Sequence, residues 1–121
     1  MTGSELHNLN IFSEENIGDA ISTALEVGSN YWIDHVVIPR DNWLEDIKYY
    51  DIPMKGGAII ITEHDGDGTE RVLNKESIAE GLEILRIKYP WHFKILIMEA
   101  YDAAAADAFL QCAVLGDIVY G

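Results

Sequence analysis

Basic residues are absent from both ends of this sequence. All eight Lys and Arg residues lie between Arg40 and Lys94, whereas residues 1–39 carry six carboxylates and residues 95–121 carry four. The formal net charge is −13 for 121 residues. A field of one sign repels nucleic acid phosphates and anionic lipid, and it attracts cations and basic protein surfaces. We therefore expect no direct binding of nucleic acid or membrane, and we expect a basic protein as partner.

Cysteine and long apolar runs are also scarce. Cys112 is the single cysteine and has no partner for an internal disulfide, which favours a reducing compartment. The longest apolar stretches, residues 58–61 and 95–98, fall far short of the roughly 20 residues that a membrane span needs. Residues 1–6 show neither the basic nor the apolar segment of a signal peptide. The prediction is a cytoplasmic protein.

The common catalytic and cofactor motifs are missing as well. The sequence contains no P-loop, no dinucleotide-binding glycine motif and no G-x-S-x-G, and its four histidines lack zinc-site spacing. Residues 63–70 gather four carboxylates and His64, which suits a Ca²⁺ or Mg²⁺ loop. The same Asp-Gly steps are typical of a tight hairpin turn, and the spacing departs from the EF-hand pattern. We predict a hairpin there, with no metal and no cofactor.

What is present predicts a folded domain, because 49% of the residues are hydrophobic. Residues 1–12 read as a polar N-terminal arm, and residues 13–121 as one domain. Ser13 is a candidate N-cap for a first helix, and Gly28 suits the left-handed position after its end. Residues 31–38 predict a strand, and residues 58–63 and 69–73 predict a hairpin.

The C-terminal half predicts two further helices. Asn74 can cap one that Pro90 stops, and Asp102 can cap an apolar one over residues 103–115 that Gly116 ends. Residues 92–98 and 118–120 are candidate strands, and residues 41–50 are ambiguous. The order of elements predicts an α+β fold: a single small domain with a mostly antiparallel sheet, a central hairpin and about three helices.

Aromatic residues supply the candidate binding positions. Tyr and Trp are rigid, amphipathic side chains that are enriched at interfaces and stacking pockets. The alternative is that Trp32 and Trp43 are core residues that cover the sheet. The candidates fall in two groups, Asn30, Tyr31 and Trp32 in the first and Trp43, Tyr49 and Tyr50 in the second.

Carboxylates of the first and last helices are the second candidate surface. Glu14, Glu15 and Asp19 begin the first helix. If they and Glu26 lie on the same side as Asp102, Asp107 and Asp117, the two helices make a continuous negative face. The competing interpretation is that these carboxylates are scattered and only keep the protein soluble.

Three segments resemble a known group of proteins. Ala-Leu-Glu-Val-Gly-Ser-Asn-Tyr-Trp at residues 24–32 is similar to a helix-end signature in small acidic proteins of phages and prophages, which lack an assigned activity. Leu-Gln-Cys-Ala-Val-Leu-Gly-Asp-Ile-Val-Tyr-Gly at residues 110–121 resembles their C-terminus, and Gly56-Gly57 before an apolar strand matches too. Val27, Cys112 and Leu115 depart from the pattern. The resemblance implies a mobile-element origin and a host-cytoplasm setting, and it assigns no catalytic residue.

Three functions follow, in order of preference. The first is a non-enzymatic acidic binding protein that engages, and by analogy inhibits, a basic host protein such as a defence or nucleic-acid-binding factor. The second is a small-molecule or nucleotide-binding module in which Asn30, Tyr31 and Trp32 line a pocket, with a homo-oligomer as one arrangement. The third is a metal-dependent hydrolase.

Overall fold

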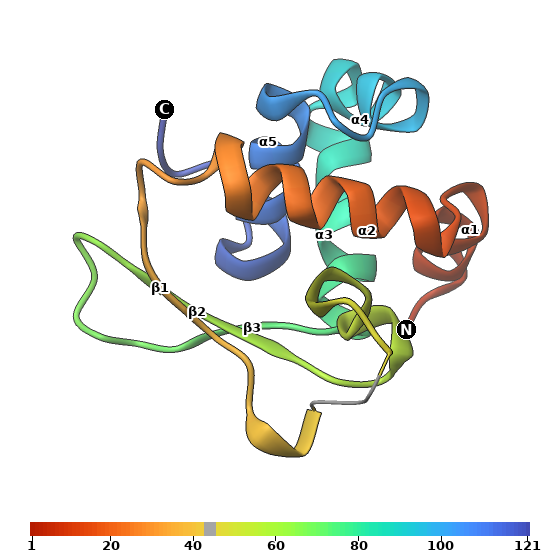
Figure 1. Ribbon diagram of the computed structural model, residues 1–121. Coiled ribbons are helices and arrows are strands. Elements are labelled where there is room, and N and C mark those ends of the chain that lie inside the picture. The colour runs from red at the N-terminus through yellow and green to blue at the C-terminus, as the bar shows by residue number, and fades with distance from the viewer. Residues whose placement is uncertain (43–45) are drawn as a thin grey trace.

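Helix α3 (Lys75–Lys88) crosses α5 (Ala103–Leu115) at the centre of the computed structural model, which describes residues 1–42 and 46–121 (Figure 1). Around this pair lie α1 (Gly3–Ile11), α2 (Glu14–Thr23) and α4 (Pro90–Met98). The described residues form these five α-helices and one three-stranded antiparallel sheet, so the predicted α+β fold is confirmed.

The sheet has the order β1-β2-β3 and lies against one end of the helices (Figure 1). Its strands are β1 (Ile33–Val37), β2 (Ile59–Glu63) and β3 (Arg71–Leu73), and β3 contacts both α3 and α5. β2 pairs with both neighbours, so the predicted strand and hairpin are confirmed. Alternation along β2 buries Ile59 and Ile61 against the helices and places Ile60 on the other face.

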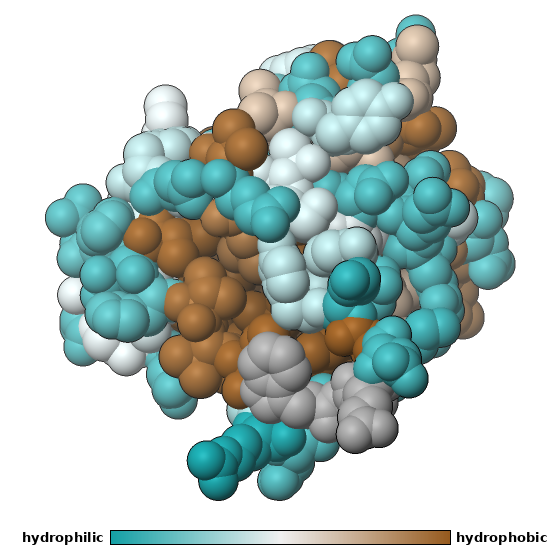
Figure 2. Space-filling view, in the orientation of Figure 1, coloured by the Kyte–Doolittle hydropathy of each residue, from teal (hydrophilic) through white to brown (hydrophobic). Residues whose placement is uncertain are grey.

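The outer face of the sheet retains apolar side chains. Ile60 pairs with Val37 on one side and with Val72 on the other, and these two valines are 54% and 42% exposed. Figure 2 shows apolar surface over the sheet.

The predicted helix caps are present. Ser13 accepts a hydrogen bond from the Asn16 backbone, and Asn74 and Asp102 accept equivalent bonds at the starts of α3 and α5. Gly116 ends α5 with a left-handed φ of 81°. These short polar side chains satisfy backbone N–H groups that the first helical turn leaves unpaired, which is why the sequence alone located them.

The end of the first helix differs from the prediction. Gly28 does not adopt a left-handed φ; instead α2 continues into a π-helical turn, η1 (Ala24–Gly28). A Cβ atom at Gly28 would lie 2.4 Å from the backbone oxygen of Ala103. Glycine is therefore required here by the close approach of α5 rather than by its own backbone dihedrals.

Two segments form helices that the sequence analysis did not predict. Residues 3–11, expected as an arm, form α1 and pack on α3, with a capping box between Thr2 and Glu5 as the signal that was missed. Residues 92–98, a candidate strand, form α4 instead, with Pro90 in its first turn.

The structure also answers two open points of the sequence analysis, at residues 118–120 and within residues 41–50. Residues 118–120 are not a strand, because the amides of Val119 and Tyr120 bond to the Gln111 side chain. Of the ambiguous segment 41–50, residues 43–45 lie outside the described residues. Its described ends contribute to two short 3-10 turns, η2 (Arg40–Asn42) and η3 (Tyr49–Asp51), and η4 (Pro53–Lys55) follows. Within the described residues, no helix is both long and apolar enough to cross a bilayer.

Candidate protein-binding surface

Asp107 on α5 gathers the first aromatic group around itself. Its Oδ1 accepts from the Ser29 hydroxyl at 2.7 Å and from the Trp32 indole at 2.8 Å, and its Oδ2 accepts from the Tyr31 hydroxyl at 2.6 Å. Burial, and then the bond to Asp107, raises the pKa of Tyr31 to about 12. The hydrogen-bonding groups of Tyr31 and Trp32 are thus occupied inside the protein.

Trp32 is a core residue, as the alternative interpretation held. It is 2% exposed and stacks on Tyr120 at 5.6 Å between ring centroids. Asn30 is exposed, but its amide donates to the Glu26 backbone oxygen and closes the turn. The Gly-Ser-Asn-Tyr-Trp segment therefore joins the end of α2 to α5, and its Tyr31 also lines a hollow of 260 Å³ beside Asp107 and Gln111.

Two members of the second aromatic group, Tyr49 and Tyr50, belong to the η3 turn, which packs against α2. The η3 turn places Tyr50 and Asp51 directly over Gly18, where a Cβ atom would come within 2.7 Å of the Asp51 Oδ1. Tyr49 and Tyr50 meet edge to face at 5.2 Å, and both are partly buried. Burial, followed by the charge of Glu26, raises the pKa of Tyr49 to about 12. Trp43, the third member of this group, lies outside the described residues.

Carboxylates lie close to these tyrosines, because the charge of Glu26 acts on Tyr49 and Asp51 follows Tyr50 in the η3 turn. Glu15 and Asp19 are four residues apart and share a face of α2, which crosses the front of the molecule in Figure 1. Glu14, on the same helix, is neutralised by Lys55 at 2.7 Å. We call the following set the α2 acidic surface: Glu15, Asp19, Glu26, Tyr49, Tyr50 and Asp51.

The continuous negative face across two helices does not form. Asp102 caps α5, and Asp107 serves the internal network. Asp117 bonds to Lys88 at 2.5 Å and to Tyr89 at 2.6 Å. Its partners, led by Lys88, lower the pKa of Asp117 to about 2. Of the predicted acidic residues, Glu14 pairs with Lys55, and the three aspartates on or beside α5 are used within the fold. Glu15, Asp19 and Glu26 form no ion pair with another described residue.

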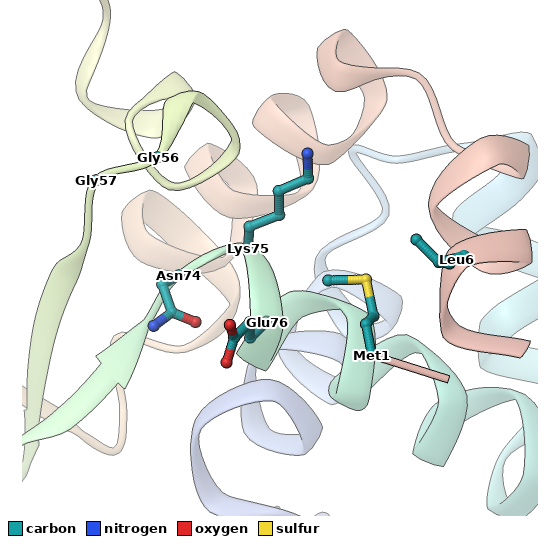
Figure 3. A pocket seen from close by; sticks show the side chains of 7 residues that line it. All are labelled: Met1, Leu6, Gly56, Gly57, Asn74, Lys75 and Glu76. Atoms are coloured by element: carbon teal, nitrogen blue, oxygen red, sulfur yellow. The ribbon is translucent and has the colours of Figure 1, made fainter. Parts of the chain in front are cut away.

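Several hollows lie on the surface of the described part of the molecule. One of 450 Å³ lies between the start of α1, the Gly56-Gly57 turn and the start of α3 (Figure 3). Its two charged side chains, Lys75 and Glu76, point in different directions, and Asn74 is engaged as the α3 cap. In residues 1–42 and 46–121, no three His, Cys, Asp or Glu side chains are placed to hold a metal ion.

Cys112 is buried and free of any disulfide. Burial, and to a smaller extent the charge of Asp117, raises the pKa of its thiol to about 12. A thiol with a raised pKa is a poor nucleophile at neutral pH, so the structure indicates that Cys112 packs in the core and does not react.

No family model matches this chain. The curated proteins and the solved structures likewise contain no match. The assignment of a function therefore depends on the surface itself.

Sequence reasoning missed the outer face of α4. Trp91 and Met98 are 58% and 71% exposed there. The sequence offered no signal for this face, because apolar residues lie on nearly all sides of α4 and only the structure shows that Phe93 and Leu96 are buried.

Proposed function

We propose that this chain is a non-enzymatic acidic binding protein, encoded by a phage or another mobile element, that engages and inhibits a basic host protein in the host cytoplasm. A defence factor or a nucleic-acid-binding factor is the class of partner that this charge suits. The observation that carries the proposal is the α2 acidic surface, where carboxylates flank two partly exposed tyrosines. The resemblance to small acidic phage proteins supports the origin.

The chemistry of this surface suits Lys and Arg side chains. Exposed carboxylates attract a basic surface over about 8–10 Å at physiological ionic strength and mainly raise the rate of association. The faces of Tyr49 and Tyr50 offer cation–π contacts to an arriving guanidinium or ammonium group. Because the same field repels phosphate, we expect no binding of DNA or RNA.

The test is a charge reversal with a matched control. Lysine is introduced at Glu15, Asp19 and Glu26 in one variant, and at Asp65, Glu70 and Glu80 in the other. Both variants carry the same net charge, but only the first alters the α2 acidic surface. Each protein is used to capture basic host proteins from a lysate, and association rates with the captured partner are measured at several salt concentrations.

We expect the α2 variant to associate at least tenfold more slowly than the wild type and to lose most of the salt dependence. The control variant should keep a rate much closer to that of the wild type. Equal slowing of both variants would show that net charge alone matters, and the α2 acidic surface would then be only a solvated helix face.

A further inference from the structure

The outer face of α4 is apolar and has no covering element in the described part of the chain. Trp91, Ile95 and Met98 follow one another at helical spacing and are 58%, 36% and 71% exposed. Tyr101, just beyond the helix, is 69% exposed. Figure 2 shows apolar atoms among polar ones at the top of the molecule, where Figure 1 places α4. We define Trp91, Ile95, Met98 and Tyr101 as the α4 stripe.

The α4 stripe supplies a large part of the area that a protein interface needs. Large aromatic side chains each present about 150–250 Å² when fully exposed. With the exposed fractions above, the stripe offers several hundred Å² of apolar surface. Standard interfaces bury about 800 Å² on each partner. Trp and Met are also enriched at interfaces relative to the rest of a protein surface.

The charge around the stripe selects the partner. The chain carries a net charge of −13, yet Lys94 is the single charged residue of α4 and Glu99 follows the helix. Neither Lys94 nor Glu99 forms an ion pair with another described residue. Two copies of the chain therefore repel each other least where their α4 helices meet, whereas a basic partner is attracted to other parts of the surface.

The stripe is also complementary to itself. Large apolar side chains lie four residues before and three residues after Ile95, so the pattern is nearly symmetric about that residue. Two antiparallel α4 helices that cross at Ile95 bring Trp91 of one copy opposite Met98 of the other, which is a favourable sulfur–aromatic contact. The same arrangement brings the Lys94 ammonium within a side chain's reach of Glu99 on the second copy. Such mutual pairing is the requirement of a two-fold interface.

We propose that the chain forms a two-fold symmetric homodimer through the α4 stripe. The dimer leaves the α2 acidic surface outside the interface, because none of its residues belongs to α4. Added salt strengthens the dimer, since the contact is mainly apolar and salt screens the repulsion between two acidic copies. Salt weakens the proposed complex with a basic protein, so the two associations are distinguished by the sign of the salt effect.

The test is sedimentation equilibrium of the full chain from low micromolar to millimolar concentration, at low and at physiological salt. We expect a dimer whose dissociation constant increases at least tenfold in Met98→Glu. Val27→Glu is the matched control, because Val27 is 64% exposed on η1 and the substitution adds the same charge. Val72→Glu tests the outer face of the sheet as the competing interface.

A charge exchange provides a second test. It does not require the protein to tolerate a charge in place of an apolar side chain. Lys94→Glu should weaken the dimer, and the double variant Lys94→Glu with Glu99→Lys should recover most of the loss. Circular dichroism confirms that each variant is folded. A wild-type chain that stays monomeric throughout, a dimer that dissociates with Val72→Glu and not with Met98→Glu, or a double variant without recovery overturns the proposal.

Discussion

Asp107 and Gln111 show how two side chains, one turn apart on α5, organise the surrounding chain. The Gln111 amide donates to Asp107, to the Tyr31 hydroxyl and to the Tyr120 backbone oxygen. Its oxygen accepts the amides of Val119 and Tyr120. Gln111 is fully buried, and these bonds offset the cost of removing its amide from water. The ends of α2 and of the chain are thereby attached to the same helix.

Replacing Asp107 with Asn should destabilise the protein by about 2–4 kcal/mol. The carboxylate accepts four hydrogen bonds, whereas an amide offers only one acceptor atom and directs an NH₂ group at other donors. Urea unfolding monitored by Trp fluorescence measures the loss. Asp65→Asn in the exposed hairpin loop is the control and should change stability by less than about 0.5 kcal/mol. Equal stability of the two variants would show that the network contributes little.

At the scale of elements, close helix packing depends on glycine and alanine. A Cβ atom at Gly81 of α3 would lie 2.5 Å from the Cα of Ala113 on α5. Gly28 is pressed against α5 in the same way. Small residues at both positions let the backbones approach, and this approach brings α5 near enough for Asp107 to reach Ser29 and Trp32.

Gly81→Ala should therefore destabilise the fold although alanine is the better helix former. We expect a loss near the upper end of about 1–3 kcal/mol, because the atoms that must move belong to the α5 backbone. Gly3→Ala in α1 is the matched control, since nothing lies within 4 Å of its Cβ position. Thermal melts of both variants give the comparison. If Gly81→Ala melts at or above the wild-type temperature, the two helices adjust at little cost.

At the scale of the whole molecule, negative charge opposes folding and a few ion pairs offset it locally. The net charge of −13 creates self-repulsion that salt screens. The described ion pairs between distant segments include Lys55 with Glu14, Arg71 with Glu63 and Lys88 with Asp117. Lys88 and Asp117 connect the end of α3 to the segment after α5.

Acid should remove the contribution of Asp117 within a defined window. Its pKa is lowered from 3.8 to about 2 in the folded protein, so its stabilising effect is complete above about 3.8 and is lost as the pH falls towards 2. We expect the difference in unfolding free energy between the wild type and Asp117→Asn to be constant above this window and to disappear below it. Urea unfolding from pH 6 to about 2 measures the difference. A difference that does not change with pH would exclude the linkage.

Local features of the sequence determined the caps, the hairpin and the α+β class. Ser13, Asn74, Asp102 and Gly116 act within one turn of their own positions, so their chemistry was sufficient for a correct prediction. The sequence also showed that both ends lack Lys and Arg, and from this charge pattern a protein-binding role was inferred.

Only the tertiary structure decided which side chains stay available at the surface. Trp32 and Asp107 are 75 residues apart, and nothing local to either shows that one bonds to the other. Gly28 looked like a left-handed cap, but the approach of Ala103 is the constraint that requires it. The apolar run in α4 could not reveal its outer face until Phe93 and Leu96 were placed against the core. Local chemistry determines how each element begins and ends, whereas long-range packing determines which groups remain free to bind.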